Sequence, residues 1–133
     1  MGVAEQASDL IELDANFLID LVQRRAPQDR EVQQWITAGS LLQVSSITWS
    51  EFLCGPIDES DVQDAKLLLR SVEPFTERDA ALAAELFNNT GRRPRSHADC
   101  MIAAHAIIRS ARLATVNLRD FRRFEKFGLK IAT

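Results

Sequence analysis

The sequence has few cysteines and no long apolar segment, and both absences exclude protein classes. Cys54 and Cys100 cannot form a disulfide framework, and with His97 and His105 they do not have the spacing of a zinc site. No apolar run approaches the roughly 18 residues of a transmembrane helix. The N-terminus has no hydrophobic region of a secretory signal peptide. We therefore expect a cytoplasmic protein that is not attached to a membrane.

The length and composition are those of one globular domain. Hydrophobic residues make up 46% of the 133 positions and charged residues 26%, which are ordinary values for a folded protein. A chain of this size buries roughly two-thirds of its unfolded surface, so its core needs neither disulfides nor a structural metal. We see no repeat and no linker. We expect residues 10–133 to form one domain after a flexible N-terminal extension, residues 1–9.

Charge is unevenly distributed along the chain. Residues 1–90 carry 6 basic and 16 acidic side chains, whereas residues 91–133 carry 10 basic and 3 acidic ones. Nucleic-acid binding follows local rather than total charge, so the basic last third is compatible with it. Folding can also mix the two parts in space and cancel the asymmetry, and both interpretations stay open here.

Apolar patterning predicts strands that alternate with helices. The predicted strands are 10–13, 41–45, 113–116 and 129–132, with a very short one at 74–75. The predicted helices are 15–25, 27–39, 47–54, 58–72, 76–88, 99–111 and 118–127. This order indicates an α/β fold with a parallel sheet of four to five short strands and helices on both faces. Ligands of such sheets bind beyond the carboxyl ends of the strands.

Acidic side chains fall at that edge of the predicted sheet. They are Asp14 after the first strand, Glu51 in the first turn after the second, Asp99 at the start of an apolar helix, and Asn117 and Asp120 after a late strand. Carboxylates that converge repel one another unless a cation lies between them. Oxygen ligands favour Mg²⁺ or Mn²⁺. The pattern therefore predicts a divalent-metal site.

Helix capping is the alternative explanation for each acid taken alone. Asp14 has the position of an N-cap. Capping-box spacing recurs at Thr48 and Glu51, Ser96 and Asp99, Asn117 and Asp120, Asp58 and Asp61, and Thr76 and Asp79. We expect the last two pairs only to cap. For the remaining acids, the only observation that favours a function over capping is that all of them lie at the same edge of the predicted sheet.

Four segments in order carry a family resemblance: LDANFLID at 13–20, SITWSEF at 46–52, DCMIAAHA at 99–106 and LATVNLRDF at 113–121. They are similar to the motifs of PIN-domain ribonucleases, specifically VapC-type toxins of bacterial toxin–antitoxin pairs. The likeness covers about residues 10–132. It implies a single PIN-like domain.

The resemblance implies roles for the acidic positions. Asp14, Glu51 and Asp99 match the metal-binding acids of the family. The fourth acidic position matches Asn117, where many members carry aspartate, and this neutral ligand should weaken a second metal site unless Asp120 compensates. All five residues are thereby candidate catalytic and metal-binding residues, with Mg²⁺, or alternatively Mn²⁺, as the cofactor.

A second set of polar residues is expected to bind substrate. Asn16 matches a polar family position near the first acid. The others are arginines that flank the acidic positions: Arg92, Arg93, Arg95 and Arg119. Arginine suits phosphate contact, and a solvated run of charge is the alternative. His105 departs from the threonine or other small residue common at its position, and we expect it to pack.

These residues and the resemblance together imply a Mg²⁺-dependent endoribonuclease toxin. Its partners would be an RNA substrate, a cognate antitoxin and a second copy in a homodimer. The alternative is a catalytically weak or inactive PIN fold that binds protein or RNA. A phosphoacceptor receiver domain would need paired acids beside Asp14 and a late lysine, and a haloacid-type phosphatase would need an Asp–x–Asp motif; the sequence has neither.

Overall fold

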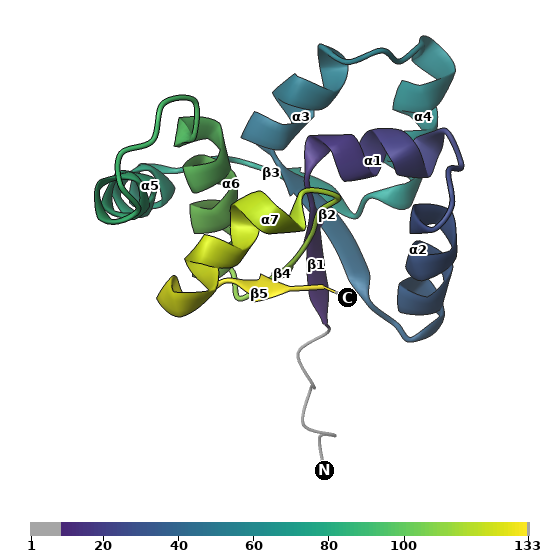
Figure 1. Cartoon of the computed structure of the whole chain (residues 1–133). Coiled ribbons are helices and arrows are strands. Elements are labelled where there is room, and N and C mark those ends of the chain that lie inside the picture. The colour runs from purple at the N-terminus through teal and green to yellow at the C-terminus, as the bar shows by residue number, and fades with distance from the viewer. Residues whose placement is uncertain (1–8, 133) are drawn as a thin grey trace.

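The sheet has five parallel strands in the order β3-β2-β1-β4-β5. It is seen in a computed structural model that describes residues 9–132 (Figure 1). The strands are β1 (Leu10–Leu13), β2 (Leu41–Ser45), β3 (Ser71–Glu73), β4 (Arg112–Ala114) and β5 (Lys130–Ile131). The predicted α/β class and parallel sheet are confirmed. Residues 1–8 of the expected N-terminal extension lie outside the described residues.

Helices cover both faces of the sheet (Figure 1). They are α1 (Ala15–Val22), α2 (Gln28–Thr37), α3 (Ser46–Leu53), α4 (Glu59–Leu68), α5 (Glu77–Asn89), α6 (His97–Ile108), α7 (Leu118–Phe121) and the 3₁₀ helix η1 (Arg122–Phe127). One hydrophobic cluster joins the first four helices to the sheet, and a second joins the others to its opposite face. None of the helices among residues 9–132 is both long enough and apolar enough to cross a bilayer.

The central strand β1 shows how the two faces are built. Ile11 and Leu13 are fully buried in the cluster with α1 and α2. Glu12, between them, points to the opposite face because successive side chains of a strand alternate. Glu12 is also fully buried and lies against α6, where it contacts His105. The core face beneath α6 therefore contains charged groups as well as apolar ones.

Two of the predicted helices differ most from the structure. The helix expected over 58–72 ends at Leu68, because residues 71–73 pair with β2 as the edge strand β3, with Gln43 opposite Ser71. Residues 74–75, expected as the short strand, follow it. The helix expected over 118–127 is one α-helical turn followed by η1, and Gly128 ends it at φ +106°. Tertiary pairing outweighed the helical pattern at β3.

The capping predictions have mixed outcomes. The boxes at Asp58 and at Thr76 both form, as predicted. The box predicted at Thr48 is wrong because α3 begins earlier, and the Ser45 hydroxyl accepts the hydrogen bond from the Thr48 amide. Ser96 does not cap α6 either, because its hydroxyl donates to the Arg93 carbonyl.

Asp79 does more than cap its helix, contrary to the prediction. Its side chain is fully buried and accepts two hydrogen bonds from the Arg109 guanidinium, at 2.8 and 3.0 Å. This pair joins α5 to α6. The Arg109 guanidinium and the hydrogen bonds from Thr76 hold the pKa of Asp79 below its ordinary value, against the effect of burial.

Candidate active site

An open cavity of about 230 Å³ lies beyond the carboxyl ends of β1 and β4. It is lined by Asp14, Ala15, Asn16, Ile19, Glu51, Gly55, Pro56, Asp99, Ile102, Asn117 and Phe121. The structure thus brings together five of the predicted site residues, from four separate segments of the chain. A larger groove of about 340 Å³ between α1, α2 and α4 contains none of them.

Asp14 is positioned by the strand pairing and by the helix that it starts. Its amide continues the pairing of β1 with β4 by donating to the Ala114 carbonyl at 3.0 Å. Its Oδ1 accepts from the Phe17 amide at 3.0 Å, so the N-cap interpretation is confirmed. The side chain also lines the cavity, so capping and a place in the site are compatible. Burial raises the pKa of Asp14, and the hydrogen bonds from Thr115 and Phe17 oppose that rise.

Thr115 belongs to the site, and our sequence reasoning missed it. Its hydroxyl donates to Asp14 Oδ2 and accepts from the Asn117 amide at 2.9 Å. The residue follows β4 as Asp14 follows β1, and Leu13 pairs with Ala114. This register, had it been known, would have placed the two side chains side by side. One buried hydroxyl therefore orients a carboxylate and the backbone that carries Asn117.

Glu51 reaches the cavity from a place that differs from the prediction. We expected it in the first turn after β2, but α3 begins at Ser46 and Glu51 lies in its second turn. The residue is exposed at the rim. Burial raises the pKa of its carboxyl, and the negative charges of Asp14 and Asp99 raise it further. Those two charges act on Glu51 only because the three carboxylates face a common space.

Asp99 lies in the first turn of α6, as expected, with its side chain 27% exposed. Burial raises its pKa, the Arg123 guanidinium lowers it, and the charges of Asp120 and Asp14 raise it again. The positive end of the α6 dipole favours the ionised form. Burial and the neighbouring acids therefore disfavour the ionised form of Asp99, and one cation favours it.

Arg123 is that cation, and it is absent from our predicted catalytic, metal-binding and substrate-binding residues. Its Nη2 lies 3.8 Å from Asp99 Oδ2, and its guanidinium stacks on the Phe124 ring at 4.7 Å. Its Nε and Nη2 are buried and have no hydrogen-bond acceptor among the described residues. A buried guanidinium with free donors beside a carboxylate can restrain that carboxylate or accept an anion. Its position in η1 depends on a 3₁₀ helix that periodicity did not predict.

Asn117 and Asp120 form a pair at the remaining side of the cavity. Asn117 is exposed and lines the cavity. Its Nδ2 donates to Asp120 Oδ2 at 2.7 Å, so the pair is not a capping box. Asp120 is not among the lining residues, although its charge reaches Asp99. The side-chain oxygen of Asn117 faces no donor among the described residues.

The predicted substrate-binding residues are more scattered. Asn16 is exposed and lines the cavity. The four arginines are exposed and lie outside its lining: Arg92, Arg93, Arg95 and Arg119. Three of them belong to the loop that leads into α6. Arg92 and Arg95 have φ of +50° and +66°, in the left-handed region that non-glycine residues seldom occupy.

The residues at the cavity fit a hard divalent cation. Their donor atoms are carboxylate and amide oxygens, which Mg²⁺ and Mn²⁺ prefer. Among residues 9–132, no group of three or more histidine, cysteine, aspartate or glutamate side chains is placed so that it could hold a metal ion, so these side chains do not form a ready-made cage. Mg²⁺ does not need such a cage, because it keeps several waters and is held by one or two carboxylates. The charges of Asp14 and Asp99 raise the pKa of Glu51, and the charge of Asp14 also raises that of Asp99; a cation between them would relieve this repulsion.

Comparison with known proteins identifies a family and a shared fold. The sequence matches the family model of the PIN domain over residues 11–127. A chain from the VapBC2 complex of Rickettsia felis has a similar structure, with a TM-score of 0.72, 19% identity, and coverage of 92% of this chain and 97% of that one. A chain from VapBC of Salmonella typhimurium has a TM-score of 0.70 at 24% identity, with coverage of 95% and 98%.

A third similar structure is a chain from a toxin–antitoxin complex of Klebsiella pneumoniae, at 27% identity and a TM-score of 0.64, with coverage of 86% and 90%. No curated protein sequence matches the chain. The family match spans both β1, which leads into Asp14, and α7, which follows Asn117. The chain therefore belongs to the PIN-domain family and has the fold found in VapBC toxin–antitoxin complexes.

Proposed function

We propose that this protein is a metal-dependent endoribonuclease, a toxin that a cognate antitoxin neutralises. The observation that carries the proposal is the meeting of Asp14, Glu51 and Asp99 around one cavity, each with a raised pKa. A structural role alone gives no reason to gather three acids that repel one another. A nuclease that holds a divalent cation does.

Asp14, Glu51 and Asp99 would hold Mg²⁺ or Mn²⁺, with Asn117 as a neutral ligand and Asp120 as its partner. Such a cation activates water and stabilises negative charge on the scissile phosphate and leaving oxygen. Thr115 keeps Asp14 in one orientation. Arg123 lies beside Asp99 and restrains it. The exposed Glu51 carboxylate is free to orient a water molecule at the mouth of the cavity.

The substrate we propose is RNA. Arg92, Arg93 and Arg95 form an exposed basic loop that leads directly into the helix of Asp99. Arginine N–H groups bind phosphate oxygens, often in pairs. Arg119 extends this positive rim from the other side, and Asn16 presents an amide inside the cavity. An RNA strand that crosses the cavity would place its phosphates between these residues.

RNA cleavage in the presence and absence of divalent cation tests the proposal. EDTA should abolish cleavage by the purified protein, and Mg²⁺ or Mn²⁺ should restore it. Cleavage that persists in a metal-free preparation would refute the metal-dependent mechanism. A folded protein that binds Mn²⁺ and RNA but never cuts would favour the alternative, a binding module in which the neutral Asn117 has cost the activity.

The antitoxin proposal is supported by the groove between α1, α2 and α4. It combines apolar walls with the carboxylates of Asp29 and Asp64 and the guanidinium of Arg24, and Leu67 beside them is 85% exposed. An amphipathic segment with apolar and basic side chains would fit this surface. An arginine from the same partner could enter the acidic cavity and compete there with the cation. We also propose that the protein is a homodimer.

Co-expression with the neighbouring gene tests the partner. The two products should copurify, RNase activity should fall, and size measurements should show two copies of this chain. Leu67→Asp should weaken the association and leave cleavage by the free protein intact. A protein that is monomeric, harmless when expressed alone and indifferent to that gene product would contradict the antitoxin proposal.

A further inference from the structure

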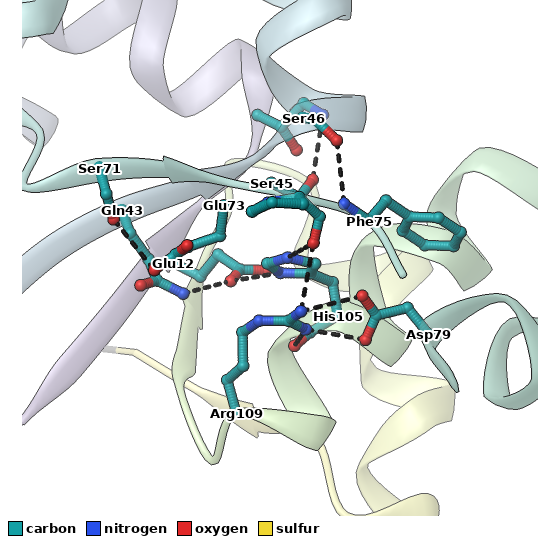
Figure 2. Close-up of polar contacts among 12 residues, drawn as sticks. Glu12, Gln43, Ser45, Ser46, Ser71, Glu73, Phe75, Asp79, His105 and Arg109 are labelled. Carbon is teal, nitrogen blue, oxygen red and sulfur yellow. Dashed lines mark hydrogen bonds and ion pairs between the residues drawn. The ribbon is translucent and has the colours of Figure 1, made fainter. Parts of the chain in front are cut away.

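A buried polar cluster lies under α6, on the face of the sheet opposite α1 (Figure 2). Glu12 Oε1 accepts from Gln43 Nε2 at 2.8 Å and lies 2.7 Å from His105 Nδ1. The side chains of Glu12 and His105 are 0% exposed. We call Glu12, Gln43 and His105 the Glu12 cluster. It lies outside the cavity that holds the acids.

The hydrogen bonds of this cluster join three parts of the fold. His105 Nε2 lies 3.2 Å from the Pro74 carbonyl and donates to it when that nitrogen carries a proton. Arg109, the C-cap residue of α6, also donates to the Pro74 carbonyl at 3.2 Å. Its guanidinium holds Asp79 through two more hydrogen bonds (Figure 2). The cluster therefore ties α6 both to the central strand and to the segment between β3 and α5.

Stability alone does not explain why charged groups occupy this position. Glu12 Oε2 is buried and has no hydrogen-bond partner among the described residues. An incompletely satisfied buried pair is often no more stable than apolar side chains of the same volume. Such a pair does restrict how α6 and β1 are placed relative to each other, because its hydrogen bonds form in only one relative position of the two elements.

The composition of the buried side of α6 explains why this helix needs such a restraint. Most residues of the buried side of the helix are small, namely Cys100, Ala103, Ala104 and Ala106, and Ile102 is the one large apolar side chain among them. Small side chains form shallow ridges, so packing leaves this helix more freedom to shift along its axis than a face of large side chains would. Hydrogen bonds from His105 to groups of two other elements remove that freedom.

Glu12 and His105 each lie a short distance along the chain from an acid of the cavity. Asp14 is two residues after Glu12, about 7 Å along the strand. Asp99 is six residues before His105, about 9 Å along a helix without glycine or proline between them. A shift of α6 on β1 therefore moves Asp99 relative to Asp14 by the same amount.

We propose that the Glu12 cluster positions the active site by fixing α6 on β1, and so sets the separation of Asp14 and Asp99. This inference rests on the proposed metal-dependent nuclease. Glu12 and His105 are positioning residues, since neither lines the cavity. The cluster would act on the affinity for the cation and on the rate of cleavage, whereas RNA binding by the exposed arginines would not depend on it.

The test compares the wild type with His105→Phe and with the apolar triple variant Glu12→Leu/Gln43→Leu/His105→Phe. Calorimetry measures the Kd for Mn²⁺, cleavage assays give kcat and KM, and thermal melts report stability. We expect His105→Phe to lower Tm, and the triple variant to recover it. Both should bind Mn²⁺ at least about tenfold more weakly, as changes behind metal ligands typically do. We expect kcat to fall in both, and KM for RNA to stay near the wild-type value.

Val32→Ala is the matched control, because it opens the core in α2 away from the cavity. It should lower Tm and leave the Mn²⁺ Kd unchanged. Triple-variant protein that is stable and binds Mn²⁺ like the wild type would overturn the inference. So would failure of both variants and of the shape-conserving Glu12→Gln to fold, since the cluster would then serve folding. A wild type that binds no Mn²⁺ would instead refute the proposed function.

Discussion

Thr115 donates its hydroxyl hydrogen to Asp14 Oδ2, and the same hydroxyl accepts from the Asn117 amide. The contact joins the ends of two neighbouring strands, β1 and β4, and holds the Asp14 side chain that lines the cavity. It opposes the rise that burial causes in the pKa of Asp14. Thr115 thus helps to keep ionised the most buried acid of the proposed metal site.

Thr115→Val should move the acidic limb of the activity profile to higher pH. The variant removes a hydrogen bond that lowers the pKa of Asp14, so the carboxyl needs a higher pH to ionise. Loss of a buried donor should also cost about 1–3 kcal/mol of unfolding free energy. The measurement is kcat/KM, and Mn²⁺ affinity, as functions of pH. Thr115→Ser keeps the hydroxyl and should behave as the wild type; equal shifts in both variants would contradict the role of the hydroxyl.

Asp14→Asn should abolish cleavage with a limited loss of stability. Asparagine caps a helix about as well as aspartate, so the hydrogen bond from Phe17 can persist. The amide group cannot accept the Thr115 hydrogen bond as Oδ2 does, but loss of a buried charge offsets part of that cost, so the unfolding free energy should fall by at most about 1–3 kcal/mol. Asp58→Asn is the matched control, because Asp58 caps α4 outside the cavity. It should remain fully active, and an active Asp14→Asn would show that Asp14 only caps.

Asp99→Asn should stabilise the metal-free protein at neutral pH. The folded pKa of Asp99 is raised above 3.8. A group of this kind contributes stability that is fully present below its unfolded pKa and is lost as pH rises through its folded pKa. The excess of the variant's Tm over the wild type, measured in EDTA, should therefore grow from pH 4 to pH 7. Saturating Mg²⁺ should reduce it by stabilising the wild type. An excess that does not change with pH would contradict the electrostatic origin.

Arg92→Gln and Arg93→Gln should raise KM for RNA and leave kcat unchanged. If each side chain contacts one phosphate, its loss should lower the slope of log affinity against log salt by about 0.7 for a single strand. Binding titrations at several salt concentrations provide this slope. Arg30→Gln, an exposed arginine on α2, removes the same charge away from the cavity. Equal effects at Arg30 would indicate attraction by net charge and not by this loop.

Local pattern was enough to predict several of the acids that meet at the cavity. Asp14 and Asp99 follow directly from an apolar strand and from the start of an apolar helix. The alternation of strands and helices then requires a parallel sheet, whose carboxyl ends share one edge. Glu51 was assigned to the same edge for the same reason. The predicted helical turn of Glu51 was wrong, because the cap at Ser45 starts α3 earlier than expected.

The contacts that orient those acids were decided by the tertiary structure. Thr115 meets Asp14 through the register of β1 on β4. Arg123 reaches Asp99 because η1 winds as a 3₁₀ helix. His105 pairs with a residue 93 positions away, a contact that no local periodicity contains. A sequence pattern specifies which face of an element is apolar, whereas the register of two packed elements is set by interactions between residues far apart in the chain.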